Sequence, residues 1–256
     1  MKEFGLNLYS LRNMIRTEKE LESTVFSLME MGYTYFQFSG APFDADMIER
    51  VSKRTGAPFV LTHVPLDVIV GDVDALMAEH EKFGCRNIGL GSIPWNVVKD
   101  ENELTKTLDA LCLSAEKMKK NGFKFFYHNH HVEFTKYGKK TVLDIILERI
   151  PSLNVTLDTY WVQYGGADVC ETVKKLAGKI GCVHLKDYAI KISSDGKFEP
   201  SFAPLGEGNL DFGKIIPEMK RAGTEYFLVE MDNAAEADDP LELIAPSAKY
   251  LKSFEV

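Results

Sequence analysis

The hydrophobic pattern of the chain alternates between two kinds of segment. Short apolar runs, many of them aromatic or β-branched, begin soon after a Gly, Pro or Asn and predict buried strands. The predicted strands are Phe4–Tyr9, Tyr33–Phe38, Phe59–His63, Asn87–Leu90, Phe123–His128, Val155–Asp158, Cys182–Leu185 and Tyr226–Met231. Longer amphipathic stretches lie between these runs and predict helices.

The predicted helices begin and end at recognisable signals. Thr17–Met31 starts with Thr-Glu-Lys-Glu, a capping pattern, and stops at Gly32. Other stretches of this kind, all but the last followed by Gly, are Asp72–Phe83, Glu101–Asn121, Asp168–Ala177, Phe212–Ala222 and Pro240–Phe254. A helix, then a Gly, then a buried strand is the rhythm of βα units.

Eight strands and eight helices, of which six are named above, can be counted along the 256 residues. Eight βα units in a chain of this length are typical of a (β/α)8 TIM barrel, so we expect an α/β fold in one domain over residues 1–256. A doubly wound sheet is the structural alternative, but no GxGxxG follows the first strand and no Ser- or Pro-rich linker divides the chain. The connection 187–209 is long and without periodicity, and we expect it to form a lid over the C-terminal face of the barrel.

Composition narrows the classes of function. A net charge of −8 and a pI of about 5.4 disfavour nucleic acid as a partner. The N-terminus lacks the apolar stretch of a signal peptide and no run approaches a membrane span, so we expect a cytoplasmic protein without membrane contact. The cysteines are scattered without a CxxC pair, and we expect reduced thiols at Cys85, Cys112, Cys170 and Cys182.

Three predicted strands carry an ionisable residue where they end. Asp158 ends NVTLD, His184 lies in GCVHLKD, and Glu230 lies in YFLVEMD. Each alone fits a helix cap, a turn or a histidine bonded to a carbonyl. Together on one rim of a barrel they predict a site, because a buried charge is costly unless it is paired or metal-bound.

The stretch FFYHNHHVEF adds histidines to the same rim. Strand alternation places His128 and His130 on one face and Tyr127 and Asn129 on the other. Imidazole together with carboxylates suits a divalent ion such as Mn²⁺, Zn²⁺, Co²⁺ or Mg²⁺. The same alternation places Lys186 beside the predicted site, to bind a substrate hydroxyl or an oxyanion, although a surface lysine paired with the next residue is an equal alternative.

Six motifs then carry a resemblance: LYSLR, HNHHVEF, LDTYW, VHLKD, PLGEGNLDF and LVEMD. In this order, from Leu8 to Glu230, the chain resembles the sugar phosphate isomerase/epimerase-like members of the xylose isomerase-like TIM-barrel superfamily, in the subgroup with the HNHxxEF motif. The resemblance implies one divalent metal on Glu, Asp, His and Glu from four successive strands. Relatives include ketose epimerases, sugar isomerases, inosose dehydratases and endonucleases of abasic DNA, so no single substrate is implied.

Carried over by position, Asp158, His184 and Glu230 match the last three ligands of that family. Many relatives read Glu-Asn-His where this chain has His128 followed by Asn-His. Either His128 is itself the first ligand, or Glu133 reaches back over the barrel mouth. The HNHxxEF subgroup favours Glu133 as a ligand and as part of the catalytic set, which leaves the histidines for substrate binding or proton transfer.

The resemblance also implies substrate contacts. His63 matches a position that faces the sugar, and Tyr9 lies in the first motif. Gln37 stands where relatives often have Glu; it can hold a hydroxyl but cannot act as a base. Trp161 is either an apolar wall for a sugar ring or a core residue.

The expected function is a metal-dependent isomerase or epimerase of a keto-sugar or related polyol. A metal polarises the carbonyl, a carboxylate removes the neighbouring proton, and an enediolate forms. We expect Glu230 as the base, with His130 and Lys186 at the carbonyl oxygen. One alternative is a lyase or dehydratase of an inosose or 3-keto-sugar, in which His128 or His130 is the acid.

A second alternative is a sugar-binding barrel without turnover, motivated by the histidine at position 128 and the glutamine at position 37. Endonuclease activity is disfavoured because an acidic surface repels the phosphate backbone. PLGEGN (204–209) is the nearest candidate for a phosphate site, but Glu207 within it disfavours an anion, so an unphosphorylated sugar is preferred. The sequence leaves a homodimer open.

Overall fold

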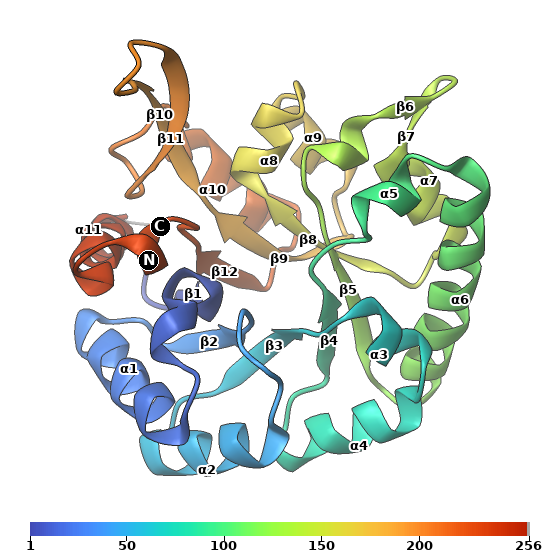
Figure 1. Ribbon diagram of the computed structural model, residues 1–256, viewed down its shortest axis with the longest axis horizontal. Helices are drawn as coiled ribbons and strands as arrows, with labels where there is room; N and C mark the ends of the chain where they lie inside the picture. The colour runs from blue at the N-terminus through green and yellow to red at the C-terminus, as the bar shows by residue number, and fades with distance from the viewer. Residues whose placement is uncertain (255–256) are drawn as a thin grey trace.

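The computed structural model describes residues 1–254 and contains a closed barrel of parallel strands surrounded by helices (Figure 1). The order around the barrel is β1-β12-β9-β8-β5-β4-β3-β2. The barrel strands are β1 (Gly5–Asn7), β2 (Tyr35–Phe38), β3 (Phe59–His63), β4 (Asn87–Leu90), β5 (Lys124–His128), β8 (Asn154–Asp158), β9 (Ile180–Leu185) and β12 (Tyr226–Val229). The predicted single-domain TIM barrel is confirmed, with residues 255–256 lying outside the described part of the chain.

Helices cover the outside of the barrel. They are α1 (Glu18–Met31), α2 (Ala45–Thr55), α3 (Leu66–Val70), α4 (Val73–Lys82), α5 (Trp95–Val98), α6 (Glu101–Lys120), α7 (Val142–Arg149), α8 (Thr159–Tyr164), α9 (Val169–Lys175), α10 (Phe212–Arg221) and α11 (Pro240–Ser253). Thr17 and Glu20 form the capping box predicted for α1, and Gly32 ends that helix with a φ of 100°. Side-chain caps of this kind satisfy backbone N–H groups that a helix leaves unpaired.

The first strand is shorter than predicted. The run Phe4–Tyr9 was expected to be extended throughout, but a 3₁₀ helix, η1 (Leu8–Met14), begins inside it. The side chain of Asn7 accepts a hydrogen bond from the backbone N–H of Tyr9 at 3.2 Å and turns the chain there. Tyr9 is thereby placed above the barrel rather than within the strand.

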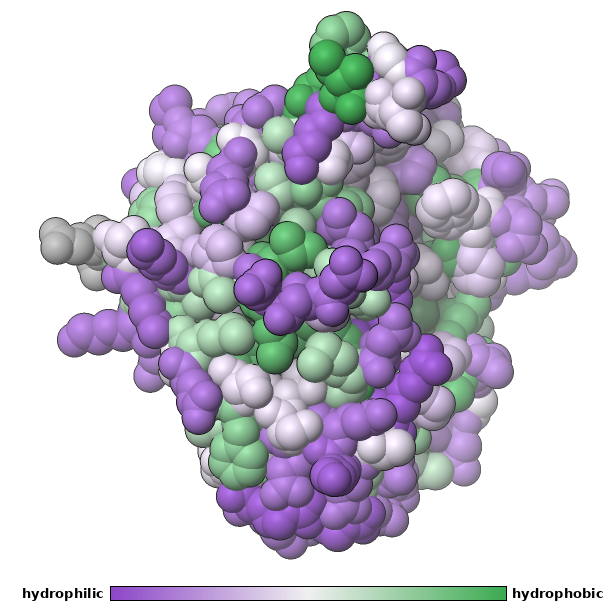
Figure 2. Space-filling model, turned by 60° about the vertical axis from the view of Figure 1, so that its left-hand side comes forward, coloured by the Kyte–Doolittle hydropathy of each residue, from purple (hydrophilic) through white to green (hydrophobic). Residues whose placement is uncertain are grey.

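The long connection after β9 also differs from the expectation, since much of it is an antiparallel hairpin. β10 (Asp187–Ile192) pairs with β11 (Phe198–Ala203), and cross-strand neighbours include Ile190 with Pro200 and Ile192 with Phe198. These apolar pairs lie on one face of the ribbon because side chains alternate along each strand. Ile190, Ile192 and Phe198 are exposed, and the hairpin that projects at the top of Figure 2 shows a green, hydrophobic group next to purple, hydrophilic ones.

The strands deliver an apolar layer and a polar layer to the barrel interior. A buried cluster of Tyr35, Leu61, Phe126, Cys182 and Leu228 fills its lower part. Two residues further along the same strands come Gln37, His63, His128, His184 and Glu230. Successive inward-facing residues are two apart on a strand, so the apolar layer supports a polar layer at the C-terminal ends.

Two further properties of residues 1–254 bear on the expectations. The cysteines are all free thiols, as predicted. Within the described residues, no helix combines the length and the apolar character that crossing a bilayer requires.

Candidate metal and substrate site

Four side chains bring potential metal ligands together at the C-terminal end of the barrel. His128 on β5, Asp158 on β8, His184 on β9 and Glu230 just after β12 each offer one ligand atom. These atoms lie within 4.8 Å of one another, and all four residues are buried. The group could hold a metal ion. Glu133, the first ligand favoured by the sequence analysis, is not part of it.

The hydrogen bonds of the two histidines fit a role as ligands. His128 Nδ1 lies 3.1 Å from the carbonyl oxygen of Gly91, and His184 Nε2 lies 2.8 Å from Oε1 of Gln37. If each of these nitrogens carries the proton, the other ring nitrogen offers its lone pair to the centre of the group. There His128 Nε2 is 3.4 Å from Asp158 Oδ2 and His184 Nδ1 is 2.8 Å from Glu230 Oε2. Electron pairs that converge in this way suit a shared cation.

Lys186 also enters the centre of the site. Its Nζ lies 3.0 Å from Asp158 Oδ2, 3.2 Å from Glu230 Oε2 and 2.9 Å from Asp232 Oδ1. The lysine is 1% exposed, so it is not a surface lysine paired with the following residue. One ammonium against three carboxylates leaves an excess of negative charge, which a divalent ion would compensate.

The electrostatics of the group keep its carboxylates ionised. Burial pushes the pKa of Glu230 upward, but Lys186 and His184 outweigh it and hold the pKa well below its usual value. The pKa of Asp158 is lowered as well, because Lys186 and His128 overcome the effect of burial. Burial lowers the pKa of His130 to about 3, with His128 and Lys186 adding to the effect, so His130 is a neutral imidazole at neutral pH.

Glu133 has a different position from the one expected. Its Oε1 accepts a hydrogen bond from the hydroxyl of Tyr127 at 2.5 Å, and its Oε2 accepts one from the backbone N–H of His130 at 2.7 Å. Both carboxylate oxygens therefore fix the turn that follows β5. Phe134 packs beside Gly165, where a Cβ would lie 2.5 Å from its ring. The Glu and Phe of the HNHxxEF motif thus shape the turn that presents the histidines.

Asp158 has two structural roles at once. Its Oδ1 accepts a hydrogen bond from the backbone N–H of Trp161 at 2.9 Å and caps α8, while its Oδ2 faces Lys186 and His128. The backbone N–H of Asp158 donates to Oδ1 of Asn129 at 3.0 Å. Asp158 thus caps a helix, as one interpretation of the sequence expected. The cap fixes Oδ1 and orients Oδ2 toward the site.

The structure separates the expected substrate contacts into two groups. Tyr9, His63 and Trp161 line a cavity at the barrel mouth. Gln37 is fully buried and absent from the cavity lining, because its amide oxygen is bonded to His184. Its place is therefore beneath the site, as a partner of a potential ligand rather than as a substrate contact.

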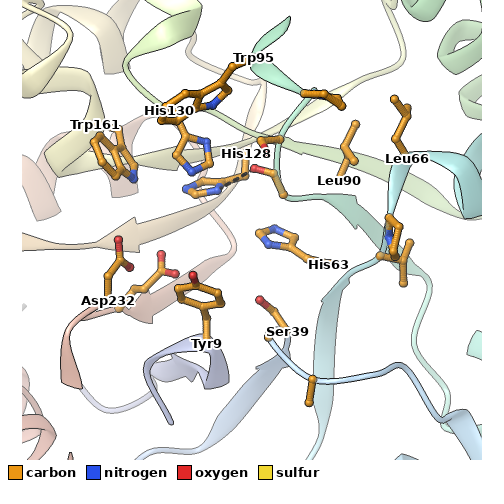
Figure 3. Close-up of a pocket in the computed structure, with 18 of the residues that line it drawn as sticks. Tyr9, Ser39, His63, Leu66, Leu90, Trp95, His128, His130, Trp161 and Asp232 are labelled. Carbon is orange, nitrogen blue, oxygen red and sulfur yellow. Dashed lines mark hydrogen bonds between the residues drawn. The ribbon is translucent and has the colours of Figure 1, made fainter. Parts of the chain in front are cut away.

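The cavity has a volume of about 970 Å³ and opens above the four-residue group (Figure 3). His128 and His130 point into it, in agreement with the predicted strand alternation, and Lys186 and Glu230 also line it. Trp161 stands at one side, with the Lys186 ammonium 5.5 Å from the centre of its ring. A sugar-sized molecule in this cavity would meet the polar group directly.

Asp232 is a cavity residue that the sequence analysis missed. It lies two residues after Glu230 and contacts Lys186. It lines the cavity on the same side as Trp161 (Figure 3). Burial raises its pKa to about 6, with Lys186 opposing the effect. The i, i+2 spacing of two carboxylates in LVEMD was the signal that could have identified it.

The PLGEGN segment does not offer its backbone to a phosphate. Asp187 Oδ1 accepts hydrogen bonds from the N–H groups of Tyr188 and Leu210, and its Oδ2 accepts from those of Gly206 and Gly208, all at 2.8–3.1 Å. An internal carboxylate thus occupies the position that an anionic ligand would take. This agrees with the expectation that the segment is not a phosphate site.

Comparison with known proteins gives a match over most of the chain. The family model described as xylose isomerase-like TIM barrel matches residues 27–254. An inosose dehydratase from Clostridium perfringens is 28% identical over 169 residues, which are 60% of this chain and 56% of that protein. The chain thus aligns with only about half the length of the curated relatives it matches.

Solved structures share the fold at low sequence identity. A sugar phosphate isomerase/epimerase from Parabacteroides distasonis superimposes with a TM-score of 0.81 and 18% identity, covering 98% of this chain and 94% of the other. An L-ribulose 3-epimerase superimposes with a TM-score of 0.71 and 19% identity, covering 98% and 93%. At this identity the similarity establishes the fold alone.

Proposed function

The chain belongs to the xylose isomerase-like TIM barrel family, and we propose that it is a divalent-metal-dependent enzyme that removes a proton next to the carbonyl of a keto-sugar or related polyol. The observation that carries this proposal is the buried group of His128, Asp158, His184 and Glu230 beneath a cavity of about 970 Å³. The preferred outcome is isomerisation or epimerisation through an enediolate.

In this proposal the four residues hold Mn²⁺, Zn²⁺, Co²⁺ or Mg²⁺, and His128 replaces Glu133 as the first ligand. A bound divalent ion polarises a carbonyl and makes the neighbouring C–H more acidic. Support comes from the ring nitrogens of His128 and His184, whose other nitrogens already have acceptors in Gly91 and Gln37.

Glu230 is the proposed base. Asn7 donates to its Oε1 at 2.9 Å, which fixes the carboxylate and leaves Oε2 toward the centre of the site. Lys186 is the proposed partner of the carbonyl oxygen, where its ammonium opposes developing negative charge. His130 remains neutral and supplies hydrogen bonds to substrate hydroxyls. Glu133 acts indirectly, by holding the turn that carries His130.

A lyase acting on an inosose or 3-keto-sugar is the second candidate. It shares the proton abstraction and differs in the next step, in which a β-hydroxyl leaves with a proton. Two observations favour it: the curated relatives are named inosose dehydratase, and His130 and Asp232 line the cavity as additional polar groups near Glu230. A sugar-binding barrel without turnover is the remaining alternative.

The first experiment detects the step that both enzymatic functions share. The protein loaded with Mn²⁺ is incubated in D₂O with a panel of ketopentoses, ketohexoses and inososes. Proton NMR follows the loss of the signal from the C–H next to the carbonyl, and ultraviolet absorbance follows enone formation. Loss of the C–H signal together with formation of a new epimer or aldose supports the leading proposal. Loss of the signal together with formation of an enone supports the lyase. Binding without exchange for every compound would instead support the non-catalytic barrel.

The base is tested by Glu230→Gln, with Glu236→Gln as the matched control on the exposed side of the same region. We expect exchange to fall by at least about 100-fold in the first variant, because a positioned acid or base contributes about 10²–10⁴ in rate. The control should exchange like the unmodified protein. Full exchange by Glu230→Gln would remove Glu230 from the role of base.

A further inference from the structure

The cavity is large for a single sugar ring, and apolar residues form much of its lining. Its volume of about 970 Å³ is near the upper end of the range of roughly 300–1,000 Å³ that holds drug-sized ligands. The polar group of His128, Lys186 and Glu230 occupies only one end. The other end extends over the termini of β3 and β4 toward α3 and α5.

That second end is an apolar lobe. It is formed by Val64, Leu66, Val70 and Leu90, and Trp95 lies at its border with the polar end, beside His130 in Figure 3. In Figure 3, Leu66 and Leu90 lie on the side of the cavity away from Trp161 and Asp232. Val64 and Leu90 are buried, whereas Trp95 is 50% exposed and Val70 is 37% exposed. An aromatic and an aliphatic side chain thus remain partly uncovered beside a closed apolar floor.

The charges around the cavity disfavour an anionic ligand. Among residues 1–254, the only Lys or Arg that lines the cavity is Lys186, which already contacts three carboxylates. Asp67 on α3 lines the cavity near the apolar lobe, and its negative charge would repel a phosphate or carboxylate group of a ligand. The backbone nest of PLGEGN is filled by Asp187. The lobe therefore offers contacts to an uncharged group.

We propose that the substrate is an uncharged keto-sugar or polyol bearing an apolar substituent, an aryl or alkyl group that binds in the lobe between α3 and α5. This inference rests on the proposed function, because the sugar-like part lies over the four-residue group. The lobe selects the substituent by burying apolar surface, at roughly 25 cal/mol per Å². Trp95 supplies the flat surface on which an aromatic substituent stacks.

The test compares matched ligands on the Mn²⁺-loaded protein. The methyl and phenyl glycosides of one 3-keto-hexose differ only in the apolar substituent, and the 6-phosphate of the methyl glycoside adds a negative charge. Calorimetric titration gives the dissociation constant of each. We expect the phenyl glycoside to bind about tenfold or more tightly than the methyl glycoside, and the phosphate to bind more weakly than either. Equal binding of phenyl and methyl glycosides, or tighter binding of the phosphate, would overturn the inference.

Helix α3 provides a matched pair of variants to locate the substituent. Val70 lines the lobe and Val68 does not, although both are valines of similar exposure, 37% and 40%. Val70→Ser and Trp95→Ala should each reduce the preference for the phenyl glycoside by roughly threefold or more. Val68→Ser should leave it unchanged. An equal loss in the two valine variants would show that the substituent does not bind in the lobe.

The outcomes separate this inference from the proposed function. If the methyl and phenyl glycosides both exchange the proton and bind with equal affinity, the proposed function stands. The inference that the substrate carries an apolar substituent is then wrong. Tight phenyl binding that depends on Trp95 and Val70, without any exchange, would keep the apolar subsite and remove the catalytic proposal.

Discussion

Nδ1 of His184 lies 2.8 Å from Oε2 of Glu230, within the buried four-residue group at the barrel mouth. The other nitrogen of His184 is bonded to Gln37, and the other oxygen of Glu230 accepts from Asn7. A hydrogen bond therefore fixes the orientation of each side chain, and Nδ1 of His184 and Oε2 of Glu230 are left facing each other. A close pair of this kind is stable when a cation lies nearby, which connects the hydrogen bonding of the barrel interior to metal binding.

The first prediction concerns the first metal ligand. His128→Ala should weaken Mn²⁺ binding by at least about tenfold, because one of four ligand atoms is lost and the ring bonded to Gly91 is removed. Isothermal titration of the metal-free protein measures the affinity. His131→Ala is the control from the same histidine stretch, since His131 is outside the four-residue group, and it should bind Mn²⁺ normally.

Glu133→Gln separates the two candidates for that ligand. We expect it to retain Mn²⁺ affinity while the free energy of unfolding falls by about 1–3 kcal/mol, because an amide cannot accept from both Tyr127 and the backbone of His130 as the carboxylate does. Chemical denaturation of the same samples gives the second quantity. Loss of metal affinity in this variant, with normal affinity in His128→Ala, would restore Glu133 as the ligand.

The second prediction concerns Lys186. Lys186→Met leaves Asp158, Glu230 and Asp232 without their buried ammonium, and without metal it should be less stable by about 3–5 kcal/mol. Mn²⁺ should then stabilise this variant more than the unmodified protein, because the ion compensates a larger excess of negative charge. Scanning calorimetry with and without Mn²⁺ measures both effects. Unchanged stability of the metal-free variant would mean that Lys186 does not neutralise the group.

The barrel and three of the four grouped residues were predictable from the sequence because they depend on local pattern. Asp158 ends β8, His184 lies one residue before the end of β9 and Glu230 directly follows β12, so all three lie on the rim once the barrel is recognised. Long-range partners were not predictable in this way. Glu133 is fixed by the Tyr127 hydroxyl and a backbone N–H, and Gln37 by a histidine 147 positions away.

The hairpin and Asp232 were missed for other physical reasons. The ribbon of β10 and β11 is amphipathic only when its two strands are paired, because each contributes half of the apolar face. Asp232 lies just beyond the strand in a motif already interpreted through Glu230, and its importance follows from the ammonium of Lys186, which a sequence does not place.

The third prediction concerns stability at acid pH. His80 is fully buried, with Nε2 2.7 Å from Thr62 Oγ1 and Nδ1 2.8 Å from the carbonyl oxygen of Leu76, and burial lowers its pKa to about 4. The unfolded chain binds a proton at its ordinary pKa of 6.5, above the folded value, so this stabilisation is present above pH 6.5 and is lost as the pH falls toward 4. The loss amounts to about 3 kcal/mol.

Urea denaturation between pH 7 and pH 4 measures this effect in the unmodified protein and in His80→Gln. The variant should be less stable at pH 7, since its amide fits the two partners poorly, but its stability should fall less on acidification. Parallel pH profiles for the two proteins would show that His80 does not contribute to acid sensitivity.

The fourth prediction concerns the contact between Gly208 and Asp187. A Cβ at position 208 would lie 2.2 Å from Asp187 Oδ1, so Gly208→Ala must displace the carboxylate that binds the 204–210 segment. Because Asp187 accepts four backbone hydrogen bonds, its displacement exposes the amides of Gly206 and Leu210 to exchange. Hydrogen exchange measured by mass spectrometry should show faster exchange in this segment and unchanged exchange in α6.

Asp187→Asn should produce the same pattern more weakly, since the amide keeps one oxygen acceptor and replaces the other with a donor that faces N–H groups. Gly213→Ala is the matched control, because its added Cβ contacts only Asp211 Oδ1, at 3.0 Å, on the surface of α10. Normal protection of the 204–210 segment in Gly208→Ala would mean that the carboxylate of Asp187 does not hold the segment. If added phosphate restored protection in Asp187→Asn, the backbone N–H groups of the 204–210 segment would form an anion site. In the unmodified protein the carboxylate of Asp187 would fill that site.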